Sequence, residues 1–143
     1  MGENISALIR LLAAFFLGSI IGMERERRSR SAGLRTHILV CVGSALFMIV
    51  SIYIYDIYKN EASVDPSRIA AGVVTGVGFL GGGTILRGEG ETRGLTTAAS
   101  IWVSSAIGLA VGCGFFGAAL ATTVIAFVTL SFLKKLESRL QHD

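Results

Sequence analysis

Five apolar segments without a single acidic residue constrain this chain more than any other feature of its sequence. They cover residues 5–23, 37–55, 69–86, 95–111 and 115–133. Each approaches the roughly 20 apolar residues that a helix needs to cross the hydrocarbon core of a bilayer. Because lipid offers no partner to backbone N–H and C=O groups, such segments form helices. We therefore predict an all-α polytopic membrane protein, a bundle of about five transmembrane helices with glycine-rich packing faces.

The composition supports the membrane class. Hydrophobic residues make up 52% of the 143 residues and charged residues 16%, against about 25% charged residues in soluble domains. The mean hydropathy is +0.65. The length suits one domain, so we predict a single transmembrane domain over residues 1–143. The N-terminus has no basic start and no small-residue cleavage site, so the first helix is expected to be retained.

Basic residues fall mostly on one side of these segments. Lys59 and Arg68 lie on the opposite side, with Arg10 near it. The remaining ten of the thirteen Lys and Arg share the other side: Arg25, Arg27, Arg28, Arg30, Arg35, Arg87, Arg93, Lys134, Lys135 and Arg139. By the positive-inside rule, the N-terminus is predicted to be outside and the C-terminus cytoplasmic.

The third and fourth segments could instead form a re-entrant hairpin broken at residues 81–83, a device that transporters use. That arrangement would place the charged turn at residues 87–93 inside the membrane, at a cost of at least about 2.5 to 3.5 kcal/mol per charge. The cost favours full crossings. The hairpin leaves the sidedness of the termini unchanged, so it remains an alternative.

Small residues recur at four-residue spacing, which places them on one face of a helix. Small faces let membrane helices approach closely, because van der Waals packing drives their association. A general richness of membrane helices in glycine is the alternative explanation. The predicted packing positions are Gly18, Gly22, Gly72, Gly76, Gly78, Gly81, Gly82, Gly83, Ser104, Gly108 and Gly112. Small faces on several helices also suggest a homo-oligomer.

Two G-x-G-x-x-G patterns, at residues 76–81 and 112–117, do not indicate dinucleotide binding. That fingerprint needs a strand before it and a helix after it, and the first match lies inside a spanning segment. No Gly-Lys-Ser or Gly-Lys-Thr follows the glycines, and His142 stands alone in the tail. We therefore predict no enzyme activity, no catalytic residues, no cofactor and no nucleic-acid partner.

Charged and hydroxyl side chains are expected to form a polar cluster at the inner face. Its predicted members are Glu24, Arg35, Thr36, Arg87, Arg93, Thr96 and Thr97. Side chains lean toward the N-terminus of their helix, so Glu24 and Arg87 are predicted to pair, with Arg35 or Arg93 as the substitute cation. A solvated charged loop around Glu24 is the equal alternative. By the same lean, Arg10 is expected to reach the outer surface as an anchor.

Thr36 and Thr96 begin the second and fourth segments, where a hydroxyl can cap free backbone N–H groups. Two helix N-termini beside arginines would also suit an anion, although capping alone explains the threonines. His37 and Cys41 lie one turn apart, but no further metal ligand is evident and we predict no metal site. The outer loop carries scattered acids at residues 56, 61 and 65, a weak ligand set for Mg²⁺.

Four motifs in order make the chain resemble the MgtC/SapB family of bacterial inner-membrane proteins. They are GSIIGMERE at residues 18–26, AGLRTH at 32–37, RIAA at 68–71 leading to GVGFLGGG at 76–83, and RGLTTAA at 93–99 with Trp102. The resemblance covers nearly the whole chain. It implies a role in growth at low magnesium and in stress adaptation. One mode proposed for the family is regulation of other membrane proteins, including the proton-translocating ATP synthase.

Two departures from the family pattern matter. Many members carry a soluble C-terminal domain after the last helix, whereas this sequence stops ten residues past Leu133. We therefore expect any role of that domain to be missing or delegated. Position 72 is Gly where the family pattern implies a polar Gln, so an intramembrane hydrogen bond there is not expected.

Two functions compete at this level. The first is a non-enzymatic membrane protein that supports cation homeostasis by regulating partners such as ATP synthase or cation transporters. The second is a transporter or channel with a pathway near residues 81–83. Intramembrane ionisable groups usually mark an ion path, and the apolar segments contain no acid, so the first is favoured.

Overall fold

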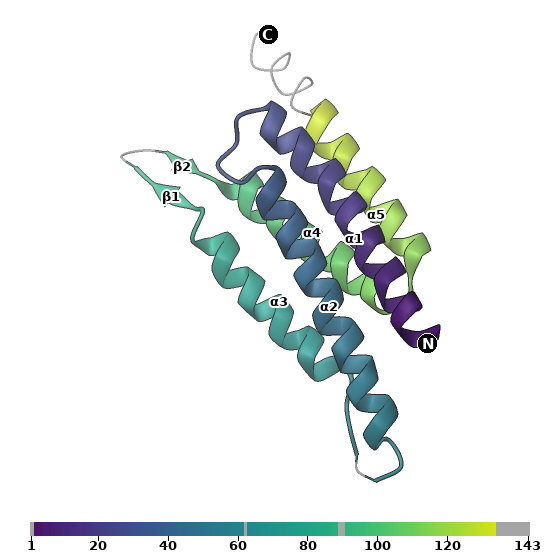
Figure 1. Cartoon of the computed structure of the whole chain (residues 1–143). Helices are drawn as coiled ribbons and strands as arrows, with labels where there is room; N and C mark the ends of the chain where they lie inside the picture. Colours follow the sequence, from purple (N-terminus) through teal and green to yellow (C-terminus); the bar gives the residue numbers. More distant parts are fainter. Residues whose placement is uncertain (1, 62, 89–90, 134–143) are drawn as a thin grey trace.

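The computed structural model describes residues 2–61, 63–88 and 91–133 (Figure 1). This part of the chain is helical, with one short antiparallel hairpin in which Leu86 faces Arg93. The elements in chain order are α1 (Gly2–Arg27), α2 (Leu34–Tyr58), α3 (Ser67–Gly82), β1 (Leu86–Arg87), β2 (Thr92–Arg93), α4 (Leu95–Gly112), α5 (Phe116–Val128) and a π-helical turn (Thr129–Leu133).

Three of the five helices, α1, α2 and α4, are long and apolar enough to cross a membrane. The other two, α3 and α5 with its π-helical extension, are shorter apolar helices. These features confirm the prediction of an all-α membrane protein of about five helices. The predicted charged tail, with Lys134, Lys135 and Arg139, lies outside the described residues.

Helix α3 ends earlier than its apolar run predicted. The run continues to residue 86, but the helix stops at Gly82, and the next residues enter the hairpin through a turn. Its 16 residues measure about 24 Å, less than the roughly 30 Å of a bilayer core. The glycines at 81–83 therefore lie at the end of one continuous helix and do not break it at its midpoint.

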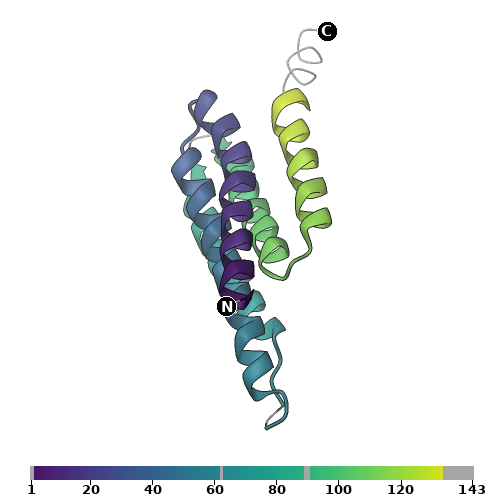
Figure 2. The ribbon, with the colours of Figure 1, turned by 45° about the vertical axis from the view of Figure 1, so that its right-hand side comes forward.

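Helix α4 occupies the centre of the bundle, where it packs against α1, α2, α3 and α5 (Figures 1 and 2). Helix α1 also packs on α2, while α5 rests on α1 and α4. Helix α3 and the hairpin flank the other side of α4 (Figure 1). The last turn of α1, the hairpin and the π-helical turn thus lie at the same end of the bundle, with the hairpin projecting to one side (Figure 1).

Glycines bring the backbones of α1, α2 and α4 into contact. A Cβ atom added at Gly18 would lie 2.9 Å from the Cys41 Cβ, and one added at Gly112 would lie 2.5 Å from the Ala45 carbonyl oxygen. Real Cβ contacts do not occur below about 3.0 Å. Gly108 faces the carbonyl oxygen of Cys41 in the same way. Any side chain at these positions would push the helices apart.

The glycines of α3 do not take part in such contacts, with one exception. A Cβ atom added at Gly72, Gly76, Gly78 or Gly82 would meet no atom within 4 Å, and one added at Gly83 would meet only its own helix. Gly81 alone touches a neighbour, 3.3 Å from the Ala98 carbonyl oxygen. The predicted packing role of these glycines is therefore wrong within the single chain, because only Gly81 meets another helix, and Gly72 and Gly76 line an open groove.

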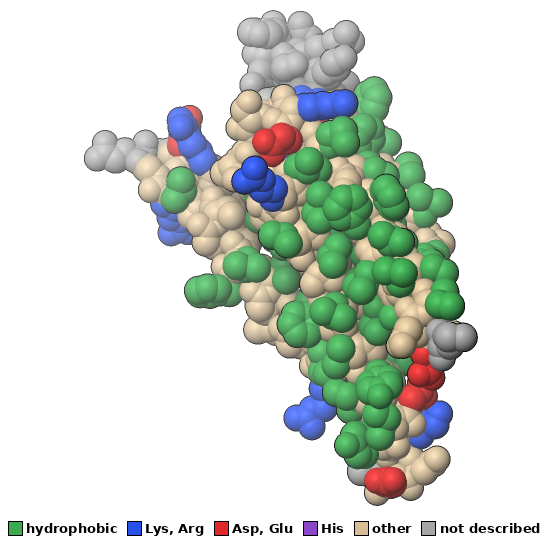
Figure 3. Space-filling view, viewed as in Figure 1, with side chains coloured by type: hydrophobic (Ala, Val, Ile, Leu, Met, Phe, Trp, Pro, Cys, Tyr) green, Lys and Arg blue, Asp and Glu red, His purple; other side chains and the backbone are tan. Residues whose placement is uncertain are grey.

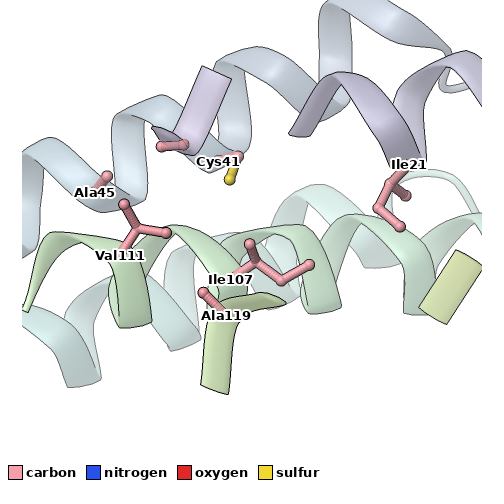
Figure 4. Close-up of a cluster of buried hydrophobic side chains, with 7 residues drawn as sticks. Ile21, Cys41, Ala45, Ile107, Val111 and Ala119 are labelled. Atoms are coloured by element: carbon pink, nitrogen blue, oxygen red, sulfur yellow. The ribbon is translucent and has the colours of Figure 1, made fainter. Parts of the chain in front are cut away.

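Buried apolar side chains fill the space that the glycines leave between α1, α2, α4 and α5 (Figure 4). Six members of this cluster carry labels in the close-up: Ile21, Cys41, Ala45, Ile107, Val111 and Ala119. Outside this core, large apolar side chains cover the flanks of the bundle, and charged side chains gather at its two ends (Figure 3). This distribution is the one that lipid contact requires of a spanning bundle.

Candidate functional site

The last turn of α1 carries a buried ionic cluster. The Glu24 carboxylate contacts the Arg25 guanidinium at 2.5 Å and accepts a hydrogen bond from the Arg28 Nε at 2.6 Å. The side chains of Glu24 and Arg25 are only 5% and 3% exposed. Both carboxylate oxygens therefore have a cationic partner, and the pair Glu24–Arg28 follows the four-residue spacing of neighbouring turns.

The same two arginines bind the end of the fifth helix. Arg28 donates to the Ser131 carbonyl oxygen at 2.8 Å, and Arg25 donates a longer bond of 3.4 Å to that of Leu130. Hydrogen bonds donated by a charged guanidinium are stronger than those between neutral groups. We call Glu24, Arg25, Arg28 and the two carbonyls the arginine clasp. It joins the last turn of α1 to the π-helical turn.

The predicted pair between Glu24 and Arg87 is wrong. Arg87 lies exposed on β1, because α3 ends at Gly82 and the hairpin carries this residue away from α1. Its neighbour Arg93 pairs with Glu91 at 2.9 Å on the exposed hairpin. The signal missed in the sequence was the four-residue spacing from Glu24 to Arg28. The other charge of this turn, Glu89, lies outside the described residues.

The predicted threonine caps are also wrong. Helix α2 begins at Leu34 after Gly33, and α4 begins at Leu95 after Gly94, with no side-chain cap at either N-cap residue. Thr36 and Thr96 therefore sit within the first turns. A carboxylate from the preceding helix serves α2 instead, since the Leu34 N–H donates to Glu26 at 2.9 Å. Arg35 is exposed on this turn, and its side chain has no hydrogen bond or ion pair to another described residue.

A polar seam crosses the buried interface of α2 and α4. His37 is fully buried, with Nδ1 2.8 Å from the Gly33 carbonyl oxygen and Nε2 3.0 Å from the Ser100 hydroxyl. Ser100 in turn lies 2.8 Å from the carbonyl oxygen of Thr97, which is itself buried. The residues from 33 to 37 and from 97 to 100 are thus held together through one imidazole ring.

The seam continues deeper into the bundle through serines. The Ser44 hydroxyl donates to that of Ser105 at 2.9 Å, again joining α2 to α4. Ser104 is also fully buried, and its hydroxyl has no hydrogen-bond partner within the described part of the chain. The sequence predicted Ser104 only as a small packing residue, and the seam was missed. Serines one turn apart fit a face of small packing residues as well as they fit a row of hydrogen-bonded hydroxyls.

Arg10 binds the backbone where α4 ends and the turn to α5 starts, at the end of the bundle where α1 begins. It is partly buried, and its guanidinium donates to the Gly112 carbonyl oxygen at 2.7 Å, at the C-terminus of α4. Carbonyls at a helix C-terminus lack partners within the helix, and a cation there is favoured by the helix dipole. Arginines toward the two ends of α1 therefore bind carbonyls of α4 and of the π-helical turn.

The loop between α2 and α3 is held by local polar contacts. Lys59 pairs with Asp56 at 3.0 Å, and this hydrogen bond raises the pKa of Lys59. The Ser67 hydroxyl and N–H both donate to Asp65, which lowers the pKa of that carboxyl. Within the described ranges, no three side chains of His, Cys, Asp or Glu come together as a metal site would require.

The sequence of this chain is similar to those of several known proteins. The model of the MgtC family matches residues 11–139. The chain belongs to the MgtC family. It is 47% identical over 137 residues to "Putative magnesium transporter YhiD" of Escherichia coli K12, covering 94% of this chain and 64% of that protein. It is 43% identical over 133 residues to "Protein MgtC" of Salmonella typhimurium, covering 93% of this chain and 54% of that protein.

A further relative is an uncharacterized protein of Synechocystis, slr0014, 43% identical over 137 residues, with 96% of this chain and 56% of that protein covered. This MgtC-family chain thus spans only a little over half to about two thirds of the length of these relatives. No solved structure matches it significantly.

Three of the motifs that carry the family resemblance meet at the site. The segment 18–26 of this MgtC-family chain supplies Glu24 and Arg25, segment 32–37 supplies His37, and segment 93–99 supplies Thr97. The arginine clasp and the His37 end of the polar seam therefore occupy one end of the bundle. This arrangement can fix helices to one another and present basic side chains at the membrane boundary.

Proposed function

We propose that this chain is a non-enzymatic protein of the bacterial inner membrane that supports magnesium-linked cation homeostasis and stress adaptation by regulating partner membrane proteins. The observation that carries the proposal is the closed interior. Backbones of α1, α2 and α4 touch at the glycines, and the one buried acid of the arginine clasp has a partner on both oxygens. The link to magnesium rests on the family and on the name of the YhiD relative.

The surface supports a role in binding partners. A groove of about 700 Å³ runs between α2 and α3, and it is lined by Gly43, Gly72 and Gly76 among larger apolar side chains. Small residues on a lipid-facing helix allow close approach of another helix. Homo-oligomerisation, and binding of other membrane proteins such as an ATP synthase or a cation transporter, are the two uses we propose for such faces.

Transport is the second candidate. The name of the YhiD relative and the buried hydroxyls of the polar seam favour it. Flux through the purified chain in liposomes separates the two functions. We expect no saturable flux of Mg²⁺, K⁺ or H⁺ down imposed gradients, because the interior is closed. The measurement uses ion-sensitive dyes trapped inside the vesicles.

The variant Gly82→Leu sharpens this experiment. No atom lies within 4 Å of a Cβ at this position, so the variant should fold, yet it fills the space at the end of α3. Gly117→Leu is the matched control, since Gly117 on α5 is equally open. Saturable flux in the parent chain that Gly82→Leu abolishes and Gly117→Leu spares would replace the regulatory proposal with a transport function.

The proposed topology places the N-terminus outside and the arginine-rich end in the cytoplasm. In a Cys113→Ser background, Arg93→Cys should react with a membrane-impermeant maleimide only after the membrane is opened. Lys59→Cys, at the opposite end of the bundle, should react in intact cells and serves as the control. Cys41 can remain because it is fully buried. Labelling of Arg93→Cys in intact cells would invert the topology.

A further inference from the structure

A groove between α1 and the fifth helix ends at the arginine clasp. It encloses about 360 Å³, within the range of small-molecule sites. The part of the groove farther from the arginine clasp is apolar. It is lined by Ile20, Met23 and Phe127, which are 42%, 43% and 37% exposed. These side chains lie in the part of the bundle that faces lipid, so an acyl chain can fill this part of the groove.

The end of the same groove that lies beside the arginine clasp is cationic. Arg27 and Arg28 line it one turn beyond Met23, together with Glu24 and Ser131. This end keeps a net positive charge, because Arg25 and Arg28 share the single carboxylate of Glu24 and Arg27 adds a further cation. Arg27 is exposed, and the side chain of Arg28 is 31% exposed. Both can therefore approach a phosphate at the membrane boundary.

We propose that this groove binds one anionic phospholipid, with the phosphate at Arg27 and Arg28 and an acyl chain against Ile20, Met23 and Phe127. The order of polarity along α1 matches that of the lipid, since the apolar positions precede the basic ones toward the end of the helix. Basic pockets between transmembrane helices at the cytoplasmic side recognise anionic headgroups. The site does not depend on whether the chain regulates partners or transports ions.

A lipid bound in this groove would also have a structural role. Helix α5 is tied to α1 at the arginine clasp, while the groove separates the two helices along the preceding turns. A lipid chain in this space would complete the contact between α1 and the fifth helix. Anionic lipid should therefore be retained through purification more strongly than lipid that only coats the bundle.

Native mass spectrometry of the purified full chain tests the site. Phosphatidylglycerol should bind at one tight position per chain, and phosphatidylcholine at equal concentration should not fill it. Arg27→Gln should weaken phosphatidylglycerol binding about fivefold, the effect of one basic residue beside an anionic headgroup. Arg30→Gln is the matched control, because Arg30 is exposed and lies close by in sequence without lining the groove.

Two further measurements address the acyl chain and the phosphate. Ile20→Trp should block binding by filling the apolar part of the groove, and excess inorganic phosphate should not displace the lipid. Equal binding of both lipids, or equal losses in Arg27→Gln and Arg30→Gln, would reduce the effect to general surface attraction and overturn the site. Displacement by phosphate alone, or unchanged binding in Ile20→Trp, would also overturn it.

Discussion

Replacing Gly108 by alanine is expected to lower the free energy of unfolding by about 3 kcal/mol, at the upper end of typical overpacking costs. The added methyl group would collide with the carbonyl oxygen of Cys41, which belongs to the backbone of α2 and cannot rotate away. The Ser44 Cβ, at 2.9 Å, blocks the adjacent direction. Denaturation of the purified chain by rising fractions of sodium dodecyl sulfate, followed by circular dichroism, measures the loss.

Gly76→Ala is the matched control for this prediction. Gly76 also lies inside an apolar helix, but no atom is within 4 Å of its added Cβ. Alanine is the better helix former by roughly 1 kcal/mol, so this variant should be as stable as the parent chain or slightly more stable. Equal stability of Gly76→Ala and Gly108→Ala would mean that α2 and α4 do not pack as described.

Glu24→Ala is expected to destabilise the chain by about 3 to 5 kcal/mol, the usual cost of removing one partner from a buried ion pair. Arg25 would remain 3% exposed without its carboxylate, and Arg28 would lose the acid that orients it toward the π-helical turn. The measurement is the same denaturation curve. Trypsin cleavage after the arginines of this turn should also become faster, because the arginine clasp would open.

Glu91→Ala provides the control for charge removal, since its pair with Arg93 is 69% and 81% exposed. Exposed ion pairs contribute about 0 to 1 kcal/mol, so this change should be small. Arg87→Ala should be similarly mild, because Arg87 is exposed on the hairpin. A large effect at Arg87 matching that at Glu24 would restore the ion pair that the sequence predicted.

The fold was predictable because bilayer chemistry leaves few choices. Apolar runs without acids must form helices, and the positions of four helices followed from those runs within a few residues. The third helix was the exception. Its run extends to Leu86, but hydropathy cannot distinguish a helical Thr84 from one in a turn that leads into a hairpin. Consecutive glycines weaken the helix at that point, and a count of apolar residues does not register this effect.

Only Glu24 and Thr97 of the predicted inner-face cluster belong to the observed clasp and seam. Glu24 was predicted to pair with Arg87 or to belong to a solvated loop, because its partners depend on where α3 ends and where the fifth helix lies. Arg25 and Arg28 bind carbonyls more than one hundred residues away, and no spacing rule reaches that far. The same holds for Arg10, whose partner is the backbone of Gly112.

The long reach of α1 has a consequence for biogenesis. Arg10 and Arg28 find their carbonyl partners 102 and 103 residues later in the chain. During synthesis the first helix therefore enters the membrane while those partners have not yet been translated. Its arginines must stay near the aqueous faces, or in contact with the insertion machinery, until the fifth helix has been synthesised.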